Sequence, residues 1–168
     1  MERRQSMQIE IVETSLADVG EVKALWGDGE VMKFVGFAQG LKKTDAEMTE
    51  WLDWIEKGRP QRNHYSIYEN GKYCGESFYN IDPETNSAAL DIKLNAFARG
   101  RGIAAYSLLY AIEQAFENGA ERVWVNPNPE NADALALYGR IGMEQKEIPP
   151  ELYDPDYTQL YFELRKNR

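Results

Sequence analysis

The chain has 168 residues, of which 43% are hydrophobic and 12% aromatic, so it suits one folded domain over residues 1–168 and not a disordered chain. Its net charge of −9 argues against nucleic acid as a partner, because a polyanion repels it. No apolar run approaches the roughly 20 residues that a membrane span needs. Residues 1–7 lack the apolar stretch of a secretory signal, and the single Cys74 excludes an internal disulfide. We therefore expect a cytoplasmic protein without a membrane partner.

The first third of the chain predicts one strand and two helices. Residues 8–13 alternate between apolar and polar side chains, as a strand does, and residues 15–26 predict a helix capped by a serine. Residues 27–43 are expected to form a loop with one short helical turn. Thr44 and Glu47 form a capping box. The helix that they begin has an apolar stripe made of Met48, Trp51, Leu52 and Ile55.

The middle of the chain predicts three strands. Residues 65–68 and 73–81 are joined by Asn70-Gly71, which is the strongest short signal for a hairpin. After a turn, residues 87–94 form the third strand. Three consecutive strands with short connections indicate antiparallel pairing.

The last third alternates helices and strands. The predicted elements are a helix over 103–117, a strand over 122–126, a helix over 131–141, and closing strands near 143–146 and 158–164. Hairpins followed by β-α-β units indicate an α/β (α+β) fold. We expect a central mixed, mostly antiparallel and twisted sheet with helices on both faces.

Residues 97–104 join the third strand of the middle region to the next helix through a glycine-rich turn with two arginines. Glycines let the backbone approach a ligand, and the first turn of a helix presents unpaired N–H groups that suit a phosphate. The positive charges of Arg99 and Arg101 lie beside these groups. The pattern predicts a phosphate cradle made by the backbone N–H groups of Gly100, Arg101, Gly102, Ile103 and Ala104.

A second motif lies downstream, where Asn131 is followed by Ala134 and Tyr138 at the spacing Asn-x-x-Ala-x-x-x-Tyr. Together with the spacing of Arg99, Gly102 and Ala104, it resembles the GNAT superfamily of acetyl-CoA-dependent N-acetyltransferases. Gly142-Met143 takes the place of that family's Gly-Phe step. The N-terminal half resembles the branch that includes ribosomal-protein and spermidine acetyltransferases.

The resemblance implies a reaction and a set of contacts. The acetyl group would move from acetyl-CoA to a primary amine by direct attack on the thioester. A backbone N–H near Leu94 would hydrogen-bond the developing oxyanion, where preorganised donors have their largest effect. Asn131 would contact the pantetheine amide, although an asparagine at this place also suits a helix cap. The alternative is an acyl-CoA-binding module without catalysis.

Proton transfer needs an acid and a base. Tyr138 is the candidate acid, since a phenol can protonate the departing thiolate, and its alternative role is that of a core aromatic. Asp91 is the candidate base. Glu76 on the neighbouring strand is the other candidate, and either carboxylate could act directly or through a water molecule. Either carboxylate could instead be an ordinary salt-bridge partner on the sheet, such as Asp91 beside Lys93.

The remaining signals concern the acceptor. Residues 147–157 carry four acidic and two tyrosine side chains without a basic one, which favours a cationic acceptor such as a polyamine, a Lys or a protein N-terminal amine. The partner is thus a small-molecule or peptide amine, and a homodimer is left open. His64, the only histidine, is expected to be exposed at a strand start, so no metal site is predicted. Cys74 is expected to be a small core residue.

Overall fold

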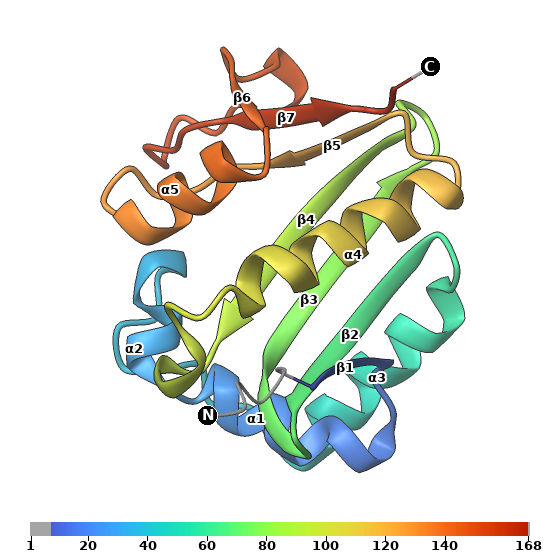
Figure 1. The fold of residues 1–168 in the computed structure, drawn as a ribbon, viewed down its shortest axis with the longest axis vertical. Coiled ribbons are helices and arrows are strands. Elements are labelled where there is room, and N and C mark those ends of the chain that lie inside the picture. The colour runs from blue at the N-terminus through green and yellow to red at the C-terminus, as the bar shows by residue number, and fades with distance from the viewer. Residues whose placement is uncertain (1–7, 168) are drawn as a thin grey trace, which may run out of the picture.

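The computed structural model describes residues 8–167, so residues 1–7, on which the prediction about a secretory signal rests, lie outside the described residues. Seven strands form one sheet in the order β1-β2-β3-β4-β5-β7-β6 (Figure 1). The strands are β1 (Ile9–Glu13), β2 (Arg62–Glu69), β3 (Lys72–Asp82), β4 (Ser87–Leu94), β5 (Arg122–Val125), β6 (Glu144–Gln145) and β7 (Phe162–Arg165). The helices are α1 (Val19–Trp26), α2 (Gly29–Met32), α3 (Asp45–Gly58), α4 (Ile103–Glu117) and α5 (Ala132–Arg140).

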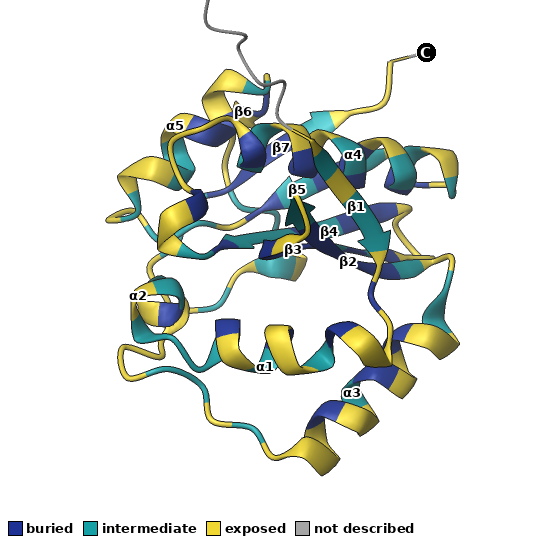
Figure 2. Cartoon of the chain, turned by 60° about the horizontal axis from the view of Figure 1, so that its bottom comes forward, coloured by how far each residue is buried: buried dark blue, intermediate teal, exposed yellow. Residues whose placement is uncertain are grey.

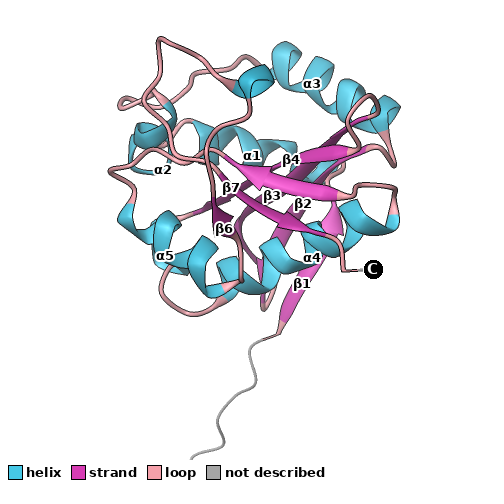
Figure 3. Ribbon diagram, turned by 90° about the horizontal axis from the view of Figure 1, so that it is seen from above, coloured by secondary structure: helices cyan, strands magenta, loops and turns pink. Residues whose placement is uncertain are grey.

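Neighbouring strands run antiparallel except for β4 and β5, which run parallel. The sheet lies between two layers of helices: α4 and α5 cover one face, and α1 and α3 cover the other (Figures 2 and 3). This confirms the predicted mixed sheet with helices on both faces. The main core fills the space between the sheet and α4, where Leu108, Ala111 and Ala115 are fully buried.

The parallel pairing of β4 and β5 is short. Its register begins at Ser87 opposite Arg122 and ends at Ala89 opposite Trp124. Residues 90–94 of β4 therefore continue without a pairing partner on the β5 side. The two strands separate at this point, and backbone and side chains of β4 become available to a ligand.

Several predicted boundaries differ from the observed ones. The helix over 15–26 is divided, because the Asp18 carboxylate accepts a hydrogen bond from the Ser15 N–H at 2.8 Å and closes a tight 3-10 turn before α1 begins. The strand β2 begins at Arg62 and not at residue 65, because its pairing with β3 extends to Asn80. The last strand begins at Phe162 and not at residue 158. These shifts arise from partners elsewhere in the chain, which local patterns do not include.

Gly75 in β3 brings two strands unusually close. Its φ is 156°, and a Cβ at this position would lie 2.0 Å from the carbonyl oxygen of Lys93 and 2.8 Å from the Cα of Leu94. The register between β2 and β3 also shifts nearby, at Ile67 and Tyr68. This close approach lies at the end of β4, where the candidate site is.

Candidate active site

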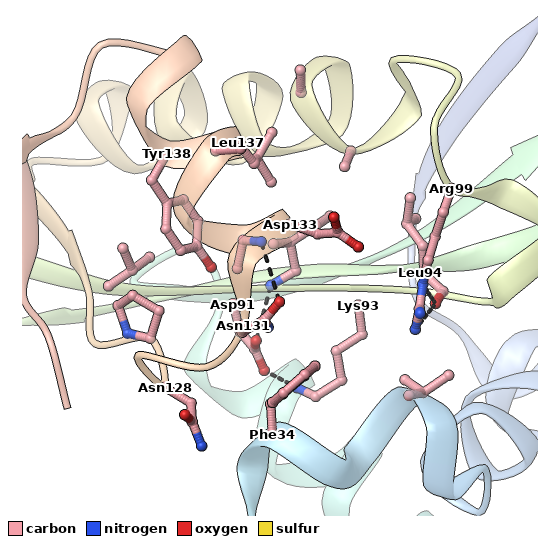
Figure 4. Close-up of a pocket in the computed structure, with 18 of the residues that line it drawn as sticks. Phe34, Asp91, Lys93, Leu94, Arg99, Asn128, Asn131, Asp133, Leu137 and Tyr138 are labelled. Atoms are coloured by element: carbon pink, nitrogen blue, oxygen red, sulfur yellow. Dashed lines mark hydrogen bonds and ion pairs between the residues drawn. The ribbon is translucent and has the colours of Figure 1, made fainter. Parts of the chain in front are cut away.

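A cavity of about 780 Å³ opens where β4 and β5 separate. Its walls come from α2 and the 3-10 turn after it, from β4, from the glycine-rich turn before α4, from the loop after β5, and from α5. Figure 4 shows side chains from these five segments converging on one space. The members that were predicted as site residues are Asp91, Leu94, Arg99, Gly100, Gly102, Ala104, Asn131 and Tyr138.

The glycine-rich turn borders the cavity at the start of α4. Gly100 and Gly102 have φ values of 76° and 82°, which favour glycine, and a Cβ on either would meet no atom within 4 Å. The first helical backbone bond runs from the Tyr106 N–H to the Gly102 carbonyl at 3.2 Å. The N–H groups of residues 103–105 therefore have no carbonyl partner in the preceding turn of the helix, as at any helix start. The turn has the space and the donors that a pyrophosphate needs.

The two arginines of this turn have different places. Arg99 lies in the cavity, and its guanidinium donates to the carbonyl oxygens of Leu94 and Glu30 at 3.3 and 3.4 Å. Arg101 points to β2 instead, where it pairs with Glu69 at 2.6 Å. Ile103 is fully buried in the core, so only its backbone can contribute to a cradle. Of the two arginines in this turn, Arg99 is therefore the one whose charge is presented to the cavity.

Asn131 caps α5 at the cavity wall. Its side-chain oxygen accepts a hydrogen bond from the Ala134 N–H at 3.2 Å, which confirms the cap that its position predicted. The amide nitrogen is not used by the cap and remains a donor. The residue can therefore cap the helix and contact a ligand with different atoms.

Tyr138 belongs both to the core and to the cavity lining. The ring packs in the core against Phe162, with ring centroids 6.0 Å apart. The hydroxyl points into the cavity toward Asp91 (Figure 4). Burial, and secondarily the charge of Asp91, raise the pKa of Tyr138, so the phenol is protonated at neutral pH and can donate.

Asp91 presents a carboxylate to the cavity, and its side chain is 44% exposed. One oxygen accepts from the Ile92 N–H at 2.9 Å, and the other is paired with the ammonium of Lys93. The salt bridge that the sequence suggested for Asp91 is therefore present. It does not remove the carboxylate from the cavity.

Glu76 and His64 lie behind the cavity wall. The two side chains are 4% and 3% exposed, and Oε2 of Glu76 is 2.6 Å from Nε2 of His64. The expectation of an exposed His64 is wrong, because α3 covers β2 and buries the imidazole. The ring centroids of Trp51 and His64 lie 4.7 Å apart in a T-shaped arrangement. Glu76 does not line the cavity, so of the two candidate bases only Asp91 can be reached by a substrate.

The cavity residues that were not predicted from the sequence include Val31, Phe34 and Val35. They come from the segment expected to be mostly loop, which folds into α2 and a short 3-10 helix over Lys33–Val35. The apolar residues of the run 31–35, interrupted only by Lys33, were the available signal. Val31, Phe34 and Val35 give the cavity an apolar wall.

The acidic segment 147–157 does not contribute to this cavity. Its Glu151 lies 4.0 Å from the guanidinium of Arg122, at the opposite end of β5 from the cavity.

Within residues 8–167, no group of three or more His, Cys, Asp or Glu side chains could hold a metal ion. No helix of this described part is long and apolar enough to cross a membrane.

Comparison with known proteins agrees with this geometry. The family model "Acetyltransferase (GNAT) domain" matches residues 8–144. An uncharacterized N-acetyltransferase from Methanocaldococcus jannaschii is 28% identical over 119 residues, which cover 66% of this chain and 53% of the relative. The N-alpha-acetyltransferase MAK3 of Arabidopsis thaliana is 48% identical over 44 residues, 26% of this chain and 23% of the relative. The matches thus span about half or less of these relatives.

Two solved structures share the fold over nearly the whole chain. A ribosomal L7/L12 alpha-N-protein acetyltransferase in complex with coenzyme A is 15% identical, with a TM-score of 0.78 and coverage of 95% of both chains. The spermidine N-acetyltransferase from Vibrio cholerae, in complex with CoA and spermine, is 16% identical, with a TM-score of 0.72 and coverage of 93% of both chains. The chain belongs to the GNAT family of acetyltransferases, whose cosubstrate is acetyl-CoA and whose acceptors are amines.

Proposed function

We propose that this domain transfers the acetyl group of acetyl-CoA to a primary amine, with Asp91 as the base and Tyr138 as the acid. The observation that carries the proposal is that one cavity holds the Asp91 carboxylate, the Tyr138 hydroxyl and the glycine-rich turn. Asp91 takes the proton of the attacking amine, and Tyr138 gives its proton to the leaving thiolate. Proton transfer of this kind contributes a factor of about 10²–10⁴ to the rate.

The cosubstrate is held by the other predicted residues. The backbone from Gly100 to Ala104, with Arg99 beside it, binds the pyrophosphate, and Arg101 supports the turn through Glu69. Asn131 donates its amide to the pantetheine arm. The Leu94 backbone, at the end of β4 that has no partner on the β5 side, donates to the oxyanion.

The acceptor in this proposal is a cationic amine: a polyamine, a Lys side chain or a protein N-terminal amine. The support comes from the exposed Asp91 carboxylate in the cavity and from the net charge of −9. One structural relative is named for spermidine and another for a ribosomal protein N-terminus, and both acceptors are amines. In this proposal residues 1–168 act as one domain in the cytoplasm, either as a monomer or as a homodimer.

The test is an amine panel in which release of free coenzyme A is followed for cationic and neutral amines. The proposal expects turnover with cationic amines, and a loss on the order of 10²-fold in kcat/KM for Asp91→Asn. A variant with Glu151→Gln and Asp154→Asn is the control, because neither side chain lines the cavity, and it should keep the wild-type KM. Acetyl-CoA binding without thiol release on any amine would favour the non-catalytic binding module. A preference for neutral amines would contradict the cationic acceptor.

A further inference from the structure

A chain of polar side chains connects the cavity to the buried face of the sheet. Its central member is Glu76 of β3, whose oxygens both accept from the Trp26 indole N–H at 3.0 Å. On one side Glu76 contacts His64, and on the other its Oε1 lies 3.6 Å from the Lys93 ammonium. Lys93 in turn pairs with Asp91 in the cavity. Two carboxylates therefore share one ammonium, and only one of the two is open to a substrate.

The inner end of this chain is fixed on every side. The Nδ1 of His64 is 2.7 Å from the Thr14 hydroxyl, which is itself 2.7 Å from the Ser66 hydroxyl. The indole of Trp51 covers the imidazole. Burying ions in this way costs several kcal/mol for each, and an apolar replacement of a buried pair is often no less stable. Stability alone is therefore a weak reason for these buried polar contacts. Their connection to the cavity suggests a role in the reaction as a second reason.

The charge states of the inner members are set by these contacts. Burial alone would raise the pKa of Glu76, but His64, Lys93 and the Trp26 N–H lower it below its usual value. Burial alone would lower the pKa of Lys93, but Asp91 and Glu76 raise it. At neutral pH Glu76 is a carboxylate and Lys93 an ammonium. Glu76 is enclosed and already accepts hydrogen bonds, so it cannot receive the proton of an acceptor amine directly.

We propose that Glu76 is a positioning residue that acts on Asp91 through Lys93. It holds the ammonium at the cavity wall and shares its positive charge, and so it sets how much of that charge the Asp91 carboxylate meets. The inference rests on the proposed function, in which the amine proton moves to Asp91. No bond to Glu76 forms or breaks in that step.

Other charged groups surround Asp91, but Lys93 is the one in contact with it among the described residues. Tyr138 faces it from α5, and Glu76 faces the shared ammonium from β3. The remaining charged side chains that line the cavity are Glu30, Arg99, Asp133 and Arg140. They are the same in all variants below, so they do not affect the comparison.

The proposal predicts opposite shifts in the pH profile of kcat/KM for the amine. Lys93→Met removes the cation beside Asp91, so the acidic limb should move to higher pH. Glu76→Gln leaves the ammonium to Asp91 alone, so the limb should move to lower pH. A shift of about half a unit changes the rate about threefold at a fixed pH on that limb.

The experiment measures these profiles at saturating acetyl-CoA for wild type, both single variants and the double variant. Lys93→Arg keeps the charge and should restore the wild-type midpoint that Lys93→Met loses. Glu163→Gln is a matched control, because Glu163 is also a buried carboxylate with two cationic partners, but it lies on β7. It should lower the melting temperature and leave the midpoint unchanged. Acetyl-CoA affinity, measured by calorimetry, reports that each variant is folded.

The outcomes separate this inference from the proposed function. If Asp91→Asn keeps full kcat/KM, the proposed function fails. If Asp91→Asn loses activity but Glu76→Gln lowers only the melting temperature, Glu76 is purely structural and this inference alone is overturned. The inference is also overturned if Glu76→Gln shifts the midpoint by the same amount in the wild-type background and in the Lys93→Met background. In that case the effect of Glu76 does not pass through Lys93. If Glu76→Gln does not bind acetyl-CoA, the Lys93 variants decide the question. An unchanged midpoint in Lys93→Met then overturns the inference. A shifted midpoint in Lys93→Met that returns to the wild-type value in Lys93→Arg supports it.

Discussion

At the scale of single residues, Tyr138 has one atom that matters for chemistry and a ring that matters for packing. Tyr138→Phe keeps the ring contact with Phe162 and deletes the hydroxyl in the cavity. We expect kcat to fall on the order of 10²-fold with little change in acetyl-CoA affinity, because only proton donation is lost. Steady-state kinetics and calorimetry measure the two quantities.

The control for this variant is Tyr161→Phe, at a buried tyrosine outside the cavity lining, which should keep kcat. A fall of less than about threefold in Tyr138→Phe is too small for a missing general acid. Such a result would return Tyr138 to the role of a core aromatic.

Gly102 tests the cradle. Gly102→Glu places a negative side chain in the open space at the start of α4, where it would repel a pyrophosphate. Acetyl-CoA binding, measured by calorimetry, should be abolished. Gly119→Glu is the matched control, because Gly119 also has a positive φ and open space, but it follows the other end of α4. Equal affinity in the two variants would remove the cradle from the proposal.

At the scale of elements, β3 and β4 approach each other closely at Gly75, next to the end of β4. In Gly75→Ala the added Cβ would overlap the Lys93 carbonyl, so the two strands must separate. We expect a loss of about 3 kcal/mol or more in the free energy of unfolding, measured in urea, from overlap and backbone strain together. Gly71→Ala, in the hairpin turn with φ 80° and no atom within 4 Å, should lose only about 1 kcal/mol. Equal losses would show that the strands do not need this contact.

At the scale of the whole molecule, the buried Glu76 links stability to pH. Its pKa falls from 4.5 to about 2, despite burial, because of His64, Lys93 and Trp26. A lowered carboxyl pKa stabilises the folded state above the unfolded value and loses that effect as pH falls through the folded one. The melting temperature should therefore decline between about pH 4.5 and pH 2, and less steeply in Glu76→Gln than in wild type. Parallel declines in the two proteins would contradict the lowered pKa.

The sequence by itself determined the features that a few neighbouring residues encode. The capping box at Thr44, the hairpin at Asn70-Gly71 and the Asn131 cap were all predicted and are all present. They depend on backbone conformations and hydrogen bonds within a few positions. The order of elements also predicted the sheet and its two helical layers, because hydrophobic periodicity shows which face of each element is buried.

Only the tertiary structure decided which side chains share the site. His64 is buried because α3 packs over β2, and Glu76 reaches it across strand pairing. Trp26 contacts Glu76 although 50 positions separate them. The acidic segment does not line the cavity, although the sequence favoured it as the surface for the acceptor. Such partners depend on strand register and helix packing, which bring distant residues together, and no local pattern contains that information.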